Sequence, residues 1–212
     1  MHKLIEILVA KYPELADCAA DFQSAFEELA ATYRRGGKVL VCGNGGSAAD
    51  SEHLVGELMK GYLARRSVPE AMRAKLLAAF PQDGAYLAEH LQGALPTISL
   101  VSQVGLITAY ANDVAPEMIF AQQVYGYGAP GDTLIGISTS GNSTNVVRAA
   151  QVARAMGVTA IGFTGRSGGA LRSVCDITVR VPLDQTADVQ ERQLAMYHAL
   201  CAMLEQEFFP TT

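Results

Sequence analysis

Four side chains in this sequence could together bind a metal ion or move protons. His53 and Glu57 are four residues apart, so they share one face of a helix if their segment is helical. Gln190 and His198 are eight residues apart, about 80° of rotation on a helix, so both can face one cleft. Two imidazoles, a carboxylate and an amide oxygen could hold a zinc ion, although amide oxygens are uncommon zinc ligands. A histidine or glutamate alone is more often a surface or core residue, so this hypothesis depends on the surrounding motifs.

A glycine-rich turn, Gly43-Asn44-Gly45-Gly46-Ser47, stands between a short apolar run and a helical pattern. Glycines allow close approach to the backbone, and a helix N-terminus directs free N–H groups at an anion, so a phosphate group suits this turn. A tight turn with Ser47 as the helix N-cap explains the same residues equally well. The turn alone leaves both interpretations open.

A second polar turn, Ser138-Thr139-Ser140-Gly141-Asn142-Ser143, also lies between an apolar run and a helical pattern. Its hydroxyl and amide groups would form a neutral cradle for phosphate oxygens, and both turns would open on the same edge of a parallel sheet. The chain contains neither the G-x-x-x-x-G-K-S/T pattern nor G-x-G-x-x-G. A small phosphorylated metabolite is therefore favoured over a nucleotide.

The elements that position these residues follow from the hydrophobic pattern. Five short apolar runs are typical of buried strands: 38–42, 97–101, 132–138, 158–164 and 176–181. Segments with helical periodicity separate them, near 46–63, 102–126, 143–156 and 187–208. This alternation predicts the α/β class, a three-layer α/β/α sandwich with a five-stranded parallel sheet.

Two segments lie outside the alternation. Residues 1–35 form a helical N-terminal segment that is interrupted at Pro13 and stops at Gly36-Gly37. Its apolar face fits either a subunit contact or ordinary packing on its own domain. Residues 64–95 delay the second strand and are interpreted as a helical insertion with short helices over 69–79 and 84–92. No linker or repeat divides the chain, so we predict one domain over 1–212.

Composition excludes several classes of protein. The 212 residues are 50% hydrophobic and 17% charged, which excludes a disordered or fibrous chain. The formal net charge of −5 makes binding to nucleic acid or to an anionic membrane surface unexpected. Cys18, Cys42, Cys175 and Cys201 are scattered singly, which is typical of thiols in a reducing compartment. With no signal peptide or membrane-spanning run, we expect a cytoplasmic protein.

Taken together, the motifs resemble a known family. Gly43-Asn44-Gly45-Gly46-Ser47-x-x-Asp50-x-x-His53-x-x-x-Glu57-Leu58, then the 138–143 turn and Gln190-Glu191, is similar to the sugar isomerase (SIS) domain, specifically the phosphoheptose isomerases. The resemblance covers nearly the whole chain outside 64–95. It implies a flavodoxin-like fold and a homotetramer with sites between subunits. It also implies conversion of sedoheptulose 7-phosphate to D-glycero-D-manno-heptose 7-phosphate in heptose precursor biosynthesis.

The resemblance also implies roles for individual residues. Glu57 and His198 would be the acid/base pair of an enediolate mechanism. We expect Glu57 to move the carbon proton and His198 the oxygen proton, and the sequence leaves the reverse assignment open. One Zn²⁺ per subunit would be held by His53, Glu57, Gln190 and His198. The residues expected to bind the substrate or its phosphate are Asn44, Gly45, Gly46, Ser47, Asp113, Ser138, Thr139, Ser140, Ser143 and Gln190.

Three departures from the family pattern keep alternatives open. Lys60-Gly61 stands where family members often have Gly-Arg, and Asp188-Val189 stands where Arg-Ile is common. The insertion at 64–95 directly follows the predicted His53 helix. Alternatives are therefore an isomerase of another ketose phosphate, or a non-catalytic SIS protein that binds a sugar phosphate as a regulatory signal. Lys60, Arg65 and Arg66 could steer an anionic substrate, although a solvated run of charges is the simpler interpretation.

Overall fold

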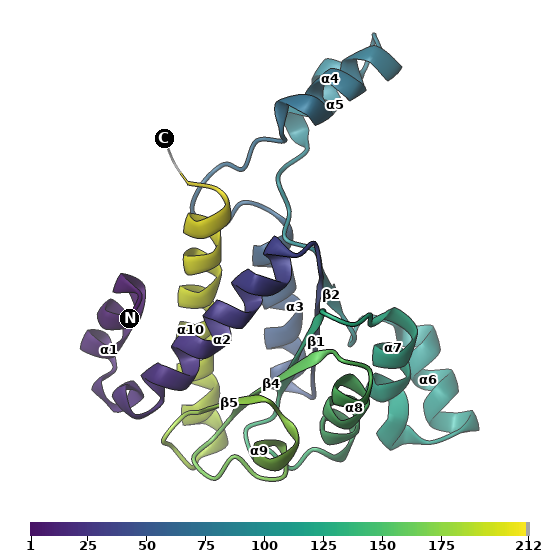
Figure 1. The fold of residues 1–212 in the computed structure, drawn as a ribbon. Coiled ribbons are helices and arrows are strands. Elements are labelled where there is room, and N and C mark those ends of the chain that lie inside the picture. Colours follow the sequence, from purple (N-terminus) through teal and green to yellow (C-terminus); the bar gives the residue numbers. More distant parts are fainter. Residues whose placement is uncertain (211–212) are drawn as a thin grey trace.

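A five-stranded sheet forms the centre of the computed structural model, which describes residues 1–210 (Figure 1). The strands are β1 (Val39–Gly43), β2 (Thr97–Ser99), β3 (Thr133–Ile137), β4 (Thr159–Thr164) and β5 (Ile177–Arg180). They are all parallel and lie in the order β2-β1-β3-β4-β5. The predicted α/β sandwich with a five-stranded parallel sheet is confirmed.

Alternate residues of each strand enter two different cores, because successive side chains of a strand point to opposite faces. Val39, Val41 and Ile135 belong to the larger core, which α2 (Ala19–Arg34), α3 (Gly46–Met59) and α10 (Thr186–Phe208) cover. Leu40 and Leu134 belong to the second core, under α7 (Ile119–Tyr127), α8 (Thr144–Ala155) and α9 (Leu171–Val174). Burial on both faces explains why the strands are apolar runs without alternation.

The N-terminal segment contains α1 (Lys3–Lys11), the 3₁₀ helix η1 (Pro13–Cys18) and α2. The chain turns at Tyr12, whose extended backbone precedes Pro13. Ile5, Leu15 and Phe22 are fully buried in the larger core. Much of the apolar face of this segment therefore packs on its own chain.

The helical pattern over 102–126 is not one helix, and this part of the prediction needs correction. It divides into α6 (Val104–Asp113), the short 3₁₀ helix η2 (Pro116–Met118) and α7. Ala115 is extended and Pro116 follows it, which breaks the helix since a residue before proline disfavours the helical conformation. The short α9 has no counterpart in the predicted elements.

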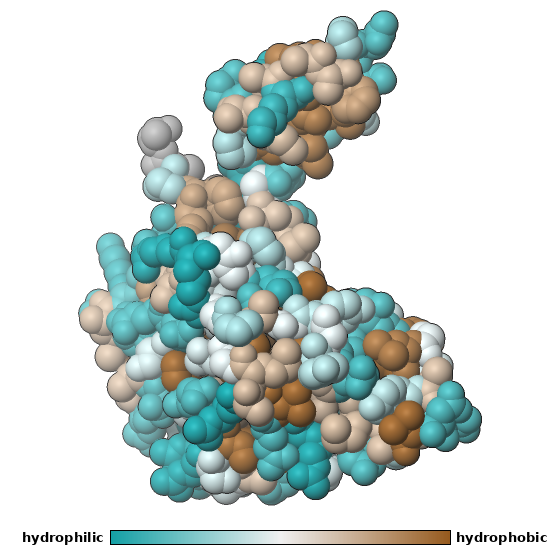
Figure 2. Space-filling view, turned by 45° about the vertical axis from the view of Figure 1, so that its right-hand side comes forward, coloured by the Kyte–Doolittle hydropathy of each residue, from teal (hydrophilic) through white to brown (hydrophobic). Residues whose placement is uncertain are grey.

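The insertion contains two helices, α4 (Glu70–Ala79) and α5 (Gly84–His90), close to the predicted bounds. They pack on each other and project away from the sheet (Figure 1). No residue of α4 is buried, and apolar side chains such as Phe80 and Tyr86 are exposed on this hairpin. Figure 2 shows hydrophobic surface on the projecting hairpin. A bridge between Ser67 and Gln92 closes its base.

Candidate functional site

The polar turns after β1 and β3 lie side by side because these two strands are neighbours in the sheet. The strand order reverses between them, and ligands of open α/β sheets bind at such a point, beyond the carboxyl ends of the strands. Asn44 and Asn145 join the turns through two hydrogen bonds, Nδ2 to Oδ1 in each direction, at 2.8 and 2.9 Å. The prediction that both turns open on one edge is confirmed, and Asn145 is a residue that sequence reasoning missed.

The first turn passes directly into α3, which begins at Gly46. Its N-cap is Gly45, with a φ of 56° that a residue with a side chain rarely adopts, and not Ser47. Ser47 lies one position inside the helix and is buried. The turn therefore offers backbone N–H groups at a helix N-terminus, and the alternative in which Ser47 caps the helix is wrong.

In the second turn, hydroxyl groups gather around the end of β3. The Oγ atoms of Ser138 and Ser143 lie 2.9 Å apart, and the Ser140 hydroxyl accepts a hydrogen bond from the Asn142 N–H. Ser138 is buried and Ser140 is exposed, so the hydroxyls run from the protein interior to its surface. Such a gradient suits an anion that binds at the surface and contacts the strand end.

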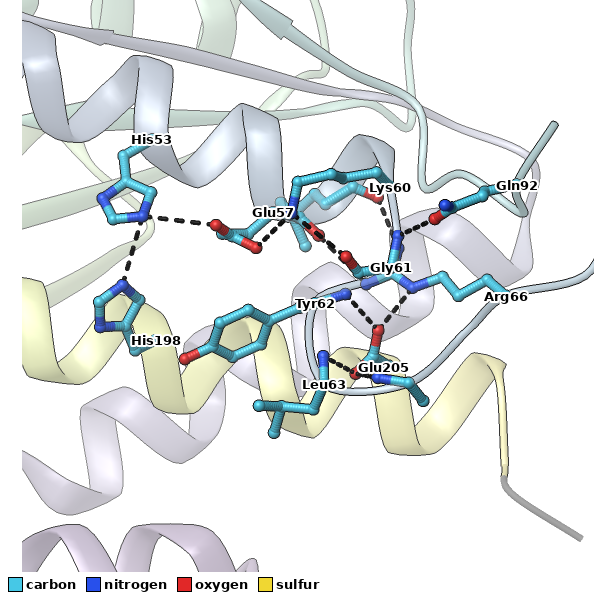
Figure 3. Close-up of polar contacts among 12 residues, drawn as sticks. His53, Glu57, Lys60, Gly61, Tyr62, Leu63, Arg66, Gln92, His198 and Glu205 are labelled. Atoms are coloured by element: carbon cyan, nitrogen blue, oxygen red, sulfur yellow. Dashed lines mark hydrogen bonds and ion pairs between the residues drawn. The ribbon is translucent and has the colours of Figure 1, made fainter. Parts of the chain in front are cut away.

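His53, Glu57 and His198 converge between α3 and α10 (Figure 3). His53 Nε2 lies 3.4 Å from Glu57 Oε1 and 3.5 Å from His198 Nε2. Glu57 is mostly buried, with 14% of its side chain exposed, whereas 44% of the His53 side chain is exposed. The i, i+4 spacing on α3 and the packing of α10 on α3 thus bring these three side chains together. Their role as an acid/base pair stays a prediction.

The surroundings of His198 favour its neutral form. Burial lowers the pKa of His198, the neighbouring His53 lowers it further, and Glu57 opposes the change. A neutral imidazole can accept a proton or ligate a metal ion near pH 7, since its ordinary pKa is already about 6.5.

The three converging side chains suit a metal ion by their chemistry. Four donors at about 2.0–2.1 Å from a tetrahedral zinc ion lie about 3.3 Å from one another. The separations of 3.4 and 3.5 Å are close to that value. Nevertheless, within residues 1–210 no group of three or more His, Cys, Asp and Glu side chains is already arranged to hold a metal ion. The donor set fits zinc, and binding would require a small adjustment of side chains.

Gln190 lies against the start of α3. A Cβ atom at Gly46 would be 2.5 Å from Gln190 Nε2, so the absence of a side chain at Gly46 leaves space for this amide. Gln190 is therefore next to the phosphate-type turn. Its roles in substrate binding and as a metal ligand both stay predictions.

Lys60, which the sequence analysis considered for steering an anionic substrate, and Tyr62, which it did not consider, both contact this cluster. Lys60 Nζ lies 3.0 Å from Glu57 Oε2, so the two oxygens of Glu57 face different partners (Figure 3). The Tyr62 ring stacks on His198, with centroids 5.8 Å apart and planes inclined by 16°. Lys60 departs from the family pattern at a position that touches the candidate base.

Arg66 is not part of a solvated run of charges, so that interpretation was wrong for this residue, whereas Lys60 and Arg65 are exposed. Its side chain is fully buried and its Nε donates to Glu205 Oε1 at 2.8 Å. Its other nitrogens donate to the backbone carbonyls of Leu58 and Glu57, at the end of α3. Burial raises the pKa of Glu205, but hydrogen bonds from the Tyr62 and Leu63 N–H groups and from Arg66 outweigh it and lower the pKa overall. This network fixes the C-terminal end of the helix that carries Glu57.

Asp113 does not join the other candidates. It ends α6 and is exposed, and its side chain accepts a hydrogen bond from the neighbouring Asn112. Within residues 1–210 it makes no hydrogen bond to another candidate residue. Asp113 could bind sugar hydroxyls only if the bound substrate extended to it, or if it faced the site of a neighbouring subunit.

Comparison with known proteins gives the family. SIS domain models match residues 14–78 and 99–203. The chain is 40% identical to a phosphoheptose isomerase from Rhodospirillum rubrum, covering 90% of this chain and 88% of that protein. It is 39% identical to one from Trichlorobacter lovleyi, covering 92% and 86%. The chain belongs to the phosphoheptose isomerase family.

Solved structures of this family have the same fold. The structure of a phosphoheptose isomerase from Francisella tularensis superimposes with a TM-score of 0.76 at 31% identity, over 95% of this chain and 94% of that one. One from Neisseria gonorrhoeae gives 0.69 at 28% identity, over 94% and 98%.

Of the residues described, no helix is long and apolar enough to span a membrane.

Proposed function

We propose that this protein interconverts sedoheptulose 7-phosphate and D-glycero-D-manno-heptose 7-phosphate, as an aldose–ketose isomerase in heptose precursor biosynthesis. The observation that carries the proposal is that Glu57 and His198 both contact His53, on and against the helix that begins at the first phosphate-type turn, in a chain of the phosphoheptose isomerase family. A carboxylate and a neutral imidazole are the groups that exchange protons near neutral pH.

Isomerisation proceeds through an enediolate. Glu57 removes a proton from C1 of the ketose, and the electron pair of that C–H bond forms the C1–C2 double bond while the C2 carbonyl oxygen becomes an alkoxide. His198 relays the proton of the C1 hydroxyl to the C2 oxygen. Glu57 returns its proton to C2 as the C1 oxygen becomes the aldehyde, so that atoms and charge balance. Microscopic reversibility makes the same pair serve the reverse direction.

Binding of the remote phosphate keeps the reacting carbons in register. The phosphate would lie between the two turns, with N–H groups from the start of α3 and hydroxyl groups of Ser138, Ser140 and Ser143 as donors. Binding energy gained far from the reacting atoms holds the substrate in one orientation. Lys60, opposite Glu57 Oε2, would hold that carboxylate in its orientation.

We also propose one zinc ion per subunit, held by His53, Glu57, Gln190 and His198. When bound, zinc would polarise the substrate carbonyl and stabilise the negative charge of the enediolate. The native protein is expected to contain about one equivalent of zinc, and His53→Ala to lose it. The matched control is His90→Ala, on the exposed helix α5. Native protein that binds no zinc with measurable affinity would contradict this part of the proposal.

A homotetramer is proposed for the assembly. Its support is the apolar surface that the single chain exposes: no residue of α6 is buried, and Val104 and Val114 are 67% and 64% exposed. A largely apolar groove also runs beside His198, lined by Leu8, Leu63 and other side chains. Light scattering should give four times the 22.5 kDa chain mass, and a monomer would contradict the proposal.

We further propose a cytoplasmic location. Its support is that Cys18, Cys42, Cys175 and Cys201 all carry free thiols, which suits a reducing compartment.

The test of the function is turnover of sedoheptulose 7-phosphate, followed by chromatography and mass detection of the derivatised aldose. Fructose 6-phosphate, a shorter ketose phosphate, serves as comparison. Conversion of the heptose at a much higher kcat/KM supports the proposal. Preference for the shorter sugar would favour an isomerase of another ketose phosphate, and tight binding without turnover would favour a regulatory protein.

A further inference from the structure

The hydroxyl group of Tyr197 lies between Asp50 and His53. It donates a hydrogen bond to Asp50 Oδ1 at 3.2 Å and lies 3.0 Å from His53 Nδ1. Tyr197 is 3% exposed, and its ring meets the His53 ring edge to face at 5.4 Å. Asp50 and His53 are three residues apart on α3, and Tyr197 comes from α10, so two elements build this contact.

The direction of these hydrogen bonds follows from the number of protons available. A tyrosine hydroxyl has one proton, and an ionised carboxylate can only accept. The proton of Tyr197 therefore points at Asp50, and a lone pair of its oxygen faces the imidazole. The second contact is a hydrogen bond only if His53 Nδ1 carries the proton, which leaves the lone pair on Nε2.

We propose that Tyr197, oriented by Asp50, is a positioning residue that holds His53 in the tautomer with its proton on Nδ1. In the opposite tautomer, Nε2 would carry a proton and could donate to Glu57 Oε1, 3.4 Å away. The side chain of Tyr197 removes that alternative. His53 Nε2 and the carboxylate of Glu57 then face each other as electron-pair donors, an arrangement that a cation stabilises.

This inference rests on the proposed function in one respect: the lone pair of His53 Nε2 would ligate the proposed zinc ion. Hydrogen-bond partners of the outer nitrogen fix the tautomer and orientation of a metal-binding histidine, and their loss typically weakens metal binding 10–100-fold. The proposal assigns that role to a tyrosine hydroxyl linked to a carboxylate, rather than to a carboxylate in direct contact.

The test compares Tyr197→Phe with Tyr33→Phe. Tyr33 is a matched control because it is also buried and its hydroxyl bonds Thr97 Oγ1 at 2.8 Å, in another part of the core. Both variants lose one buried hydroxyl, so a purely structural effect is shared by both.

Imidazole ¹⁵N shifts of the metal-free protein at pH 8 report the tautomer directly, with His53 assigned by the loss of its signals in His53→Gln. In native protein and Tyr33→Phe, we expect a protonated Nδ1 and an unprotonated Nε2. In Tyr197→Phe, the Nε2-protonated form should become substantially populated. A native His53 that is protonated on Nε2, or a tautomer that Tyr197→Phe leaves unchanged, overturns the inference.

Zinc titration gives the second readout. Tyr197→Phe should weaken zinc binding 10–100-fold, and Asp50→Asn should weaken it less, because the amide oxygen can still accept from Tyr197. Equal affinity of Tyr197→Phe and native protein contradicts the inference. Failure of the proposed function is distinguishable, since it appears as absent turnover by native protein, whereas the tautomer and the zinc affinity are measured without substrate.

Discussion

The buried ion pair between Arg66 and Glu205 should contribute far more to stability than an exposed pair of the same residue types. In Arg66→Met, Glu205 loses the donor at 2.8 Å, and the carbonyls of Glu57 and Leu58 lose theirs. Glu205 keeps the N–H donors of Tyr62 and Leu63 but stays buried without its counter-ion. Removing one partner of a buried ion pair costs about 3–5 kcal/mol. We therefore expect Arg66→Met to lower the free energy of unfolding by about 3–5 kcal/mol.

The matched control is an exposed ion pair whose glutamate lies on α10, the helix that also carries Glu205. Arg34 pairs with Glu207 of α10, but 57% of the Arg34 side chain is exposed. Exposed pairs contribute about 0–1 kcal/mol, so Arg34→Met should change stability by no more than that. Urea unfolding followed by far-ultraviolet circular dichroism measures both variants, at one protein concentration since the stability of an oligomer depends on it.

Arg66→Lys keeps the charge but loses the planar fork of donors, so we expect an intermediate loss. This variant also keeps the test decisive if Arg66→Met does not fold. The reasoning is refuted if the Arg66 variants and Arg34→Met differ by less than about 1 kcal/mol, the contribution of an exposed pair.

Three further outcomes are expected. Gly46→Ala should weaken zinc binding and turnover while changing the free energy of unfolding little, because the added methyl group would displace the flexible Gln190 amide. Zinc titration, the turnover assay and urea unfolding check this. Gly141→Ala should lower the melting temperature, because a φ of 68° and a nearby backbone carbonyl exclude a side chain. Burial raises the pKa of Asp132, but hydrogen bonds, mainly from Lys38, lower it overall. Its stabilisation should therefore be complete above about pH 4 and decline as pH falls further, as urea unfolding of native protein and Asp132→Asn would show.

Features set by local pattern could be predicted from the sequence. Strands buried on both faces leave short apolar runs, and helices leave a period near 3.6, so the sheet and most helices were found. The carboxyl ends of neighbouring parallel strands lie at the same edge of the sheet, so the sequence pattern predicts that the two turns lie side by side. The i, i+4 spacing of His53 and Glu57 fixed their common face.

Contacts between distant residues could not be predicted in this way. Arg66 lies in a sequence that resembles a solvated run, and its partner Glu205 is 139 residues away. Asn145 pairs with Asn44 across 101 residues. The only available signal for this pair is that neither residue has an obvious partner of opposite charge nearby in the sequence. A single sequence does not show which helix faces meet, so it could not join the two.

Proton transfer by Glu57 is measured most directly by running the isomerisation in D₂O and determining the deuterium content of the product by mass spectrometry. We expect native protein to form an aldose that carries deuterium at C2, since a proton held by a carboxylate exchanges with solvent. Glu57→Gln should fold, bind the sugar phosphate and turn over at least about 100-fold more slowly, the contribution typical of a positioned general base. Turnover by Glu57→Gln at the native rate, or product from native protein that carries no deuterium, would contradict the enediolate mechanism proposed here.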